Sequence, residues 1–200
     1  MARTALIDSG DVVLNVIEAD DSFEPPTGVT KKDVGSRAVS PGDVYDSGAD
    51  TFTTPPPPLD EARKTKVAEI EAKYDAILNG GFDYDFGSKT ATLEDGTTET
   101  AGVRTLQTRP ADRERWATTN QVASQYIGAG QPSEPMRPFR TADNARVPMT
   151  AQEANDCLNA MQAKFGAALE AMWDHKDAVR ALTDVDAVIA YDISSNPAWP

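Results

Sequence analysis

Residues 141–182 read TADNARVPMTAQEANDCLNAMQAKFGAALEAMWDHKDAVRAL, a pattern that predicts a short β-hairpin followed directly by one long helix. Thr150 can act as the N-cap, and Glu153 can complete a capping box by reaching back to the Thr150 backbone. A helix of roughly 32 residues spans about 48 Å at ~1.5 Å per residue, so the rest of the chain must cover a long apolar face. Apolar residues recur at helical spacing, at Ala154, Leu158, Met161, Phe165, Leu169, Trp173 and Leu182, flanked by Ala168, Met172 and Val179.

Two other segments can supply that cover. Residues 82–86 alternate aromatic and acidic side chains, which places three aromatic rings on one face of a strand. Residues 108–127 predict a second helix, which Thr108 caps and which has Pro110 in its first turn. The covering residues are expected to be Phe82, Tyr84 and Phe86 from the strand and Trp116, Val122, Ala123 and Tyr126 from the second helix.

The end of the long helix is expected to meet a short helix that Thr183 or Asp184 begins and that contains Val188 and Ile189. Residues 174–176, which include His175, are expected to be a solvated turn. Residues 193–200 show no periodicity and are expected to form an extended tail that is loosely ordered or docked on a partner through Trp199.

The first part of the chain, residues 1–54, is expected to be a small β-rich unit. Residues 4–20 predict a hairpin whose second run, residues 12–17, is apolar enough to sit centrally in a sheet. Residues 21–40 have the composition of a loop. A second hairpin over residues 43–53 is expected to pair Tyr45 with Phe52 across its strands.

Residues 55–80 are expected to be a linker followed by a connecting helix. Four consecutive prolines, residues 55–58, favour an extended, semi-rigid spacer. Residues 59–79 then predict a helix whose charged faces are either solvated or flank a coiled-coil seam between copies of the chain. Its narrow apolar stripe consists of Val67, Ile70, Tyr74, Ile77 and Leu78.

Together these elements predict the α+β class, with residues 81–192 as a domain in which the two long helices pack with a small antiparallel sheet. The formal net charge of −13 argues against a protein that binds nucleic acid, because phosphate contacts need a surplus of Lys and Arg. It argues equally against docking on an anionic membrane. No apolar run approaches the ~18 residues of a membrane span.

No catalytic, cofactor-binding or metal-binding residue is predicted. The sequence holds one cysteine, Cys157, and one histidine, His175, so a Cys/His zinc site cannot form. Asp174 and His175 are adjacent on a helix and therefore diverge, and no G-x-S-x-G motif marks a nucleophile. Acidic clusters such as Asp43, Asp46 and Asp50 lack the spacing of an EF-hand loop. Residues 112–115, Asp-Arg-Glu-Arg, are expected to make surface or inter-helix ion pairs.

The order of these segments resembles bacteriophage tail and tail-fibre proteins. The N-terminal likeness rests on residues 12–17, 25–28, 42–46 and 51–56. The C-terminal likeness, over residues 81–192, is to a domain of uncharacterised function common in phage tail proteins, and rests on residues 81–82, 108–127, 140–144, 149–152 and 189–192. Residues 90–102 depart from that pattern.

This resemblance implies a structural component of a phage tail, at the fibre or baseplate. Such a protein would be made in the bacterial host cytoplasm and would bridge other virion proteins without catalysis. It is expected to form a homo-oligomer, for which a trimer is one form. Two alternatives are a tail-fibre assembly chaperone that leaves the finished particle and a receptor-binding module that contacts host glycans. Exposed aromatic residues such as Trp199 are the sequence's only support for the glycan alternative.

Overall fold

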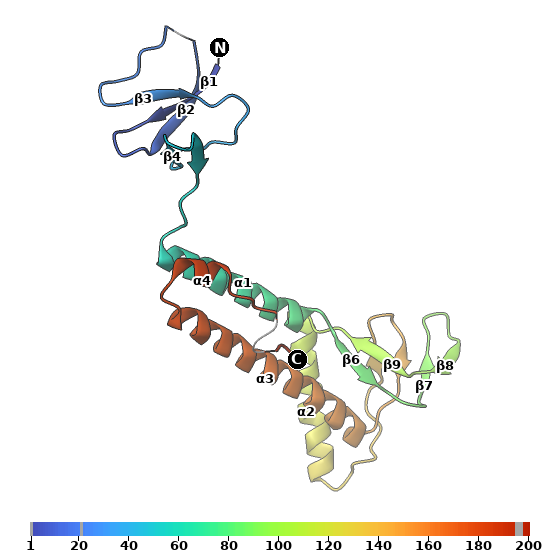
Figure 1. Ribbon diagram of the computed structural model, residues 1–200. Coiled ribbons are helices and arrows are strands. Elements are labelled where there is room, and N and C mark those ends of the chain that lie inside the picture. Colours follow the sequence, from blue (N-terminus) through green and yellow to red (C-terminus); the bar gives the residue numbers. More distant parts are fainter. Residues whose placement is uncertain (1, 21, 195–197) are drawn as a thin grey trace. The chain divides into compact units, whose positions relative to one another are not determined.

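The computed structural model describes residues 2–20, 22–194 and 198–200 (Figure 1). It confirms the α+β class, with helices and antiparallel sheets in one chain. The chain divides into two compact units, Met1–Pro58 and Leu59–Pro200. The first unit has one buried apolar cluster and the second unit has two. Of the expected C-terminal tail, residues 195–197 lie outside the described part of the chain.

The first unit contains a three-stranded antiparallel sheet in the order β2-β1-β3. Its strands are β1 (Ala2–Ile7), β2 (Val13–Ala19) and β3 (Thr30–Asp33). The expected central place of the second run is wrong, because β1 pairs on both sides and Leu14 of β2 is 51% exposed. The strand β3 lies inside the segment predicted as loop. Its residues, Thr-Lys-Lys-Asp, carry no apolar alternation, and they form a strand by pairing with the free edge of β1.

The second hairpin of this unit, β4 (Val44–Asp46) and β5 (Thr51–Thr53), is confirmed. The Tyr45 and Phe52 rings lie opposite each other with centroids 4.8 Å apart. Both rings pack against the buried cluster of the sheet, so the hairpin closes this small core. The buried members of the cluster are Ala5, Ile7, Val13, Val34 and Val39.

The second unit is organised around α3 (Ala151–Ala181), the predicted long helix. The predicted capping box is present, since the Glu153 backbone N–H donates to the Thr150 hydroxyl at 3.4 Å and the Thr150 N–H donates to the Glu153 carboxylate at 2.8 Å. The buried positions repeat every seven residues, as in a coiled coil. One row is Ala154, Met161, Ala168 and His175, and the other contains Ala151, Leu158, Met172 and Val179.

This heptad repeat corrects the predicted stripe. Trp173 is 54% exposed, and Met172 and His175 face the core in its place. The predicted stripe follows a spacing of four residues from Phe165 through Leu169 to Trp173. The buried rows of the helix instead advance by 3.5 residues per turn, which turns Trp173 out of the interface.

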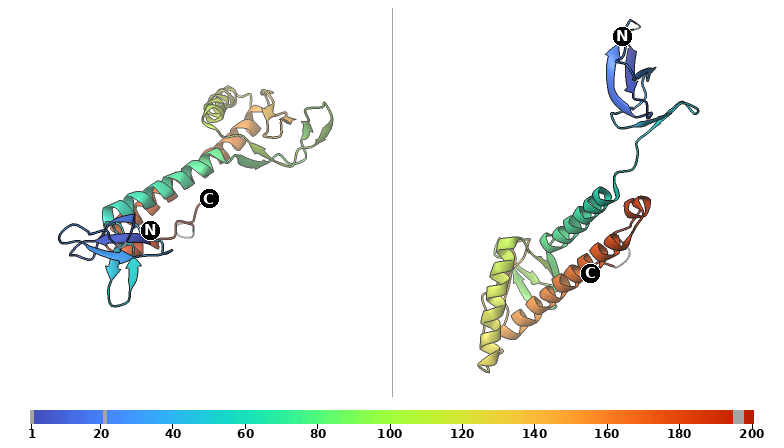
Figure 2. Two further views of the ribbon diagram at one scale, coloured as in Figure 1. Left: turned by 90° about the horizontal axis from the view of Figure 1, so that it is seen from above. Right: turned by 90° about the vertical axis from the view of Figure 1, so that its left-hand side faces the viewer.

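Different elements cover the two halves of α3 (Figures 1 and 2). The N-terminal half packs against α2 (Pro110–Gly128) and the strands, while the C-terminal half packs against α1 (Leu59–Asn79) and α4 (Val185–Ile189). The assignment of residues 55–80 to a separate linker and connecting helix is therefore wrong for α1, which belongs to the second unit. Of the predicted apolar stripe of α1, Ile70 is fully buried inside the unit, and Val67 and Tyr74 are partly buried against the same cluster.

Two small sheets extend the N-terminal half. The strand β6 (Phe82–Asp85) pairs with β9 (Val103–Leu106), and the Phe82, Tyr84 and Phe86 rings are neighbours, as expected from their alternation. A four-stranded sheet has the order β10-β11-β7-β8. Its strands are β7 (Thr90–Thr92), β8 (Thr98–Thr100), β10 (Phe139–Arg140) and β11 (Arg146–Val147), and the last two form the hairpin that precedes α3.

Two predictions about α2 are wrong. The Thr108 hydroxyl does not cap the helix, because it is buried and accepts a hydrogen bond from the Gly81 N–H at 3.0 Å. The N-cap is Arg109, without a side-chain cap, although Pro110 does occupy the first turn as predicted. Val122 is 37% exposed, and Asn120 is buried instead. Asn120 faces α3 in a hydrogen-bonded ladder with Asn155 and Asn159, a polar contact that apolar periodicity cannot reveal.

The predicted short helix after α3 is confirmed as α4, with Asp184 as its N-cap. Its Val188 side chain is buried beside Val179, as expected, whereas Ile189 is 50% exposed. Arg63 of α1 donates to the Leu182 carbonyl at 2.6 Å, which ties the end of α3 to α1. These contacts close the second core around the C-terminal half of the long helix.

We expect Ile70→Ala to lower the free energy of unfolding of the second unit by about 2–5 kcal/mol, because Ile70 is fully buried and the truncation leaves a cavity. Urea unfolding followed by tryptophan fluorescence measures this unit alone, since Trp116, Trp173 and Trp199 all lie within it. Val103→Thr, at a 67% exposed position of the same unit, is the control and should change stability by less than about 0.5 kcal/mol. Equal effects of the two substitutions would contradict this packing.

We expect Glu153→Gln to reduce the loss of stability in acid. Burial raises the pKa of Glu153, but the Lys89 ammonium and the Thr150 N–H and hydroxyl outweigh it and hold the pKa below its ordinary value of 4.5. A carboxylate with a lowered folded-state pKa stabilises the fold above about pH 4.5, and this contribution is lost as pH falls through the folded value. Urea unfolding between about pH 6 and pH 3 should give a shallower decline for the variant. Parallel curves would contradict this role for the charge.

Candidate functional site

His175, the one histidine of the chain, is buried in the second unit, whereas the sequence predicts that it is exposed to solvent. It is fully buried on α3, and its Nδ1 lies 2.9 Å from the Tyr191 hydroxyl. The Trp199 ring stacks on the imidazole with centroids 5.1 Å apart and planes at 20°. The expectation of a solvated turn fails because residues 174–176 continue the helix and the heptad repeat turns His175 inward.

Trp199 is accordingly half-buried inside its own unit. Its Nε1 donates to the Ile193 carbonyl at 2.6 Å, and its ring packs within the cluster that α1, α3 and α4 form. The glycan-binding alternative depended on an exposed aromatic side chain at this position. These contacts weaken that alternative.

The other reactive or acidic residues singled out in the sequence also have structural positions. Burial raises the pKa of the Cys157 thiol to about 12, which keeps it protonated. Hydrogen bonds from the Ser40 N–H and the Thr54 hydroxyl lower the pKa of Asp43. In residues 2–20, 22–194 and 198–200, no group of three or more His, Cys, Asp or Glu side chains is arranged to hold a metal ion. The sequence holds another acidic pair, Asp20 and Asp21, of which Asp21 lies outside these residues.

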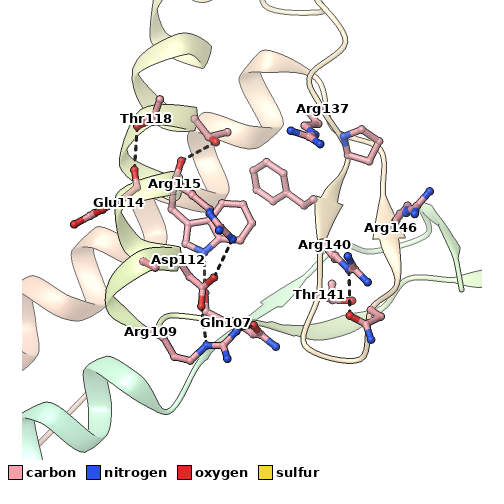
Figure 3. A pocket seen from close by; sticks show the side chains of 16 residues that line it. Gln107, Arg109, Asp112, Glu114, Arg115, Thr118, Arg137, Arg140, Thr141 and Arg146 are labelled. Carbon is pink, nitrogen blue, oxygen red and sulfur yellow. Dashed lines mark hydrogen bonds and ion pairs between the residues drawn. The ribbon is translucent and has the colours of Figure 1, made fainter. Parts of the chain in front are cut away.

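An open groove of about 1430 Å³ lies in the second unit, between α2 and the β10–β11 hairpin (Figure 3). We call it the arginine groove, because five arginines and only two acidic residues line it. They are Arg109, Arg115, Arg137, Arg140 and Arg146 against Asp112 and Glu114. A formal local surplus of positive charge therefore lies within a protein whose net charge is −13.

Two aromatic rings form the floor of this groove. The Trp116 and Phe139 rings are tilted against each other with centroids 5.0 Å apart. The Trp116 Nε1 donates to the Gln107 carbonyl at 2.8 Å, which fixes the indole in place. Phe139 is buried and Trp116 is partly exposed, so the groove offers an apolar surface beside its charges.

The α2 wall is largely neutralised by contacts within the helix (Figure 3). The Asp112 carboxylate accepts from Arg109 Nε at 3.0 Å and lies 3.7 Å from Arg115. The Thr118 and Thr119 hydroxyls donate to backbone carbonyls one turn earlier. The expectation of ion pairs in residues 112–115 is thus confirmed for Asp112.

Arg113 points away from the groove and joins α2 to α1. Its guanidinium donates to the Leu78 and Thr108 carbonyls and to the Asn79 side chain, at 2.7–3.1 Å. This residue therefore positions the start of α2, and with it the wall of the groove.

On the hairpin wall, in contrast, the arginines are not neutralised by acidic side chains of the described part of the chain. Arg140 and Arg146 lie directly opposite each other across β10 and β11, a placement of like charges that destabilises a sheet. Arg140 Nε donates to Asn144 Oδ1 at 3.1 Å, and Asn144 in turn reaches Glu94 at 3.4 Å. Within the described residues, no hydrogen bond or ion pair engages the guanidinium of Arg137 or Arg146.

Sequence reasoning missed this groove. Its walls come from two separate segments of the chain, and only the fold brings Arg109 and Arg115 beside Arg137, Arg140 and Arg146. The available signal was weak: in a chain with 19 basic and 32 acidic residues, residues 137–146 contain three arginines and one aspartate.

Comparison with known proteins gives a family but no activity. No curated protein matches the chain, and no solved structure matches it. In the described part of the chain, no helix has the length and apolar character needed to cross a bilayer. A family described as "Domain of unknown function (DUF4376)" matches residues 61–195, which cover α1 to the start of the tail. Because this match includes well over half of the chain, the protein belongs to the DUF4376 family.

Proposed function

We propose that this protein is a structural component of a bacteriophage tail, at the fibre or the baseplate, and that it bridges other virion proteins without catalysis. The proposal starts from the resemblance of residues 12–56 and 81–192 to phage tail proteins. It locates the protein in the virion tail after synthesis in the bacterial host cytoplasm.

The observation that carries the bridging role is the division of the chain into two units with separate cores. The unit Met1–Pro58 closes its core with β1 to β5, and the unit Leu59–Pro200 closes its own around α3. The proline run at residues 55–58 ends the first unit. Two independently packed units on one chain can bind two different proteins, which is the minimum that a bridge requires.

The arginine groove adds a surface suited to binding. It combines exposed arginines with a partly exposed tryptophan, and Arg and Trp are the residue types enriched at the energetic centres of protein interfaces. Self-association is a separate part of the proposal. The proposed homo-oligomer, of which a trimer is one form, is checked by sedimentation of the purified protein.

Mass spectrometry of gradient-purified phage particles tests this function. We expect peptides from both units in intact particles, at a ratio to the other tail proteins that stays constant between preparations. Particles made without the gene should lack fibres or a complete baseplate in electron micrographs. Capsid proteins from the same gradient fraction are the internal control.

Absence of the protein from particles that nevertheless require its gene for fibre assembly would contradict the structural role and would indicate the assembly chaperone instead. Particles that assemble and infect normally without the gene would contradict both roles.

A further inference from the structure

We propose that the arginine groove binds an acidic segment of another polypeptide, one that carries an aromatic or aliphatic side chain among its carboxylates. This inference rests on the proposed bridging function and names the chemistry of one partner.

Within the described residues, three arginines on the hairpin wall of the groove have no ion pair with a carboxylate, which favours an acidic partner. Arg140 and Arg146 face each other across two strands, and Arg137 precedes them on the same wall. The chain has a large surplus of carboxylates, yet in its described part none forms an ion pair with these three guanidinium groups. Carboxylates from a partner would neutralise a repulsion that the fold leaves in place.

The geometry of arginine favours carboxylates as the ligand. A guanidinium presents its N–H donors in a planar fork that matches the two oxygens of a carboxylate. On the α2 wall, the Asp112 carboxylate already lies between two guanidinium groups, with one oxygen toward Arg109 and the other toward Arg115. The hairpin wall offers the same donors with the carboxylate position open.

The floor of the groove explains why the segment should also be apolar in part. Trp116 and Phe139 meet at 5.0 Å between the two walls, and the indole is held by its bond to Gln107. A side chain that packs on the exposed part of Trp116 leaves water and gains about 25 cal/mol for each Å² of apolar surface buried. A segment with carboxylates on both sides of one apolar residue meets both features at once.

A polypeptide fits these features better than a nucleic acid. A continuous polyanion would be repelled by the net charge of −13, and Asp112 and Glu114 interrupt the α2 wall. A short segment with separated carboxylates can contact the arginines while it avoids both acidic residues.

Fluorescence anisotropy with the full-length protein tests the proposal. The probe is a labelled peptide of alternating Glu and Asp residues around a central Phe. One comparison peptide has Gln and Asn in place of the acids, and a second has Ala in place of Phe. We expect saturable binding of the first peptide only, weakening steeply between about 50 and 300 mM NaCl because exposed charges are screened.

The double variant Arg137→Gln/Arg146→Gln should weaken peptide binding by about tenfold or more. It should not lower the melting temperature, because neither guanidinium has a partner in the described structure and one like-charge pair is removed. Arg180→Gln is the matched control. Its side chain is 66% exposed on the last turn of α3, does not line the groove, and should leave binding unchanged.

Four results would overturn the proposal. They are equal binding of the acidic and amide peptides, no effect of the double variant, equally tight binding of a heparin oligosaccharide, and arginine-dependent self-association, which would assign the groove to a second copy. Each of these results is independent of the virion test. If the protein is present in particles but does not bind the peptide, only the proposed role of the groove is contradicted. If the protein binds the peptide but is absent from particles, only the proposed tail function is contradicted.

Discussion

Burial of two heptad rows of α3 is the interaction on which the second unit depends. One half of the helix packs on α2 and the strands, and the other half packs on α1 and α4. Neither half could exist as an isolated helix with an exposed apolar face, because the stability of a long amphipathic helix comes mainly from tertiary packing. The helix therefore connects two small cores, and its continuity positions every other element of the unit.

The capped start of α3 also positions the arginine groove. The Ala151 and Gln152 N–H groups donate to the carbonyls of Glu134 and Pro132, and the Met136 N–H donates to the Met149 carbonyl. The Ala151 and Gln152 bonds use donors that the first turn of a helix leaves unpaired. They fasten the segment that leads into β10, so the hairpin wall is held against the same helix that supports α2.

Charge distinguishes this groove from the rest of the protein. In the first unit, by contrast, the Asp50 carboxylate forms ion pairs with both Lys32 and Arg37. On the hairpin wall the arginines face each other instead. Family membership supplies no function for this feature, whose distinguishing properties are the guanidinium groups without ion pairs to the described residues and the aromatic floor between the walls.

Local signals in the sequence determined the bounds of α1 and α3, the capping box at Thr150 and Glu153, and the aromatic pair of the second hairpin, because each depends on residues close in the chain. Only the tertiary structure decided which face of a helix is buried and which strand is central. It turned His175 inward and Trp173 outward, because packing against two partners selects the heptad rows over the locally more apolar face. It alone assembled the arginine groove, because distant segments become neighbours only when the core they share has formed.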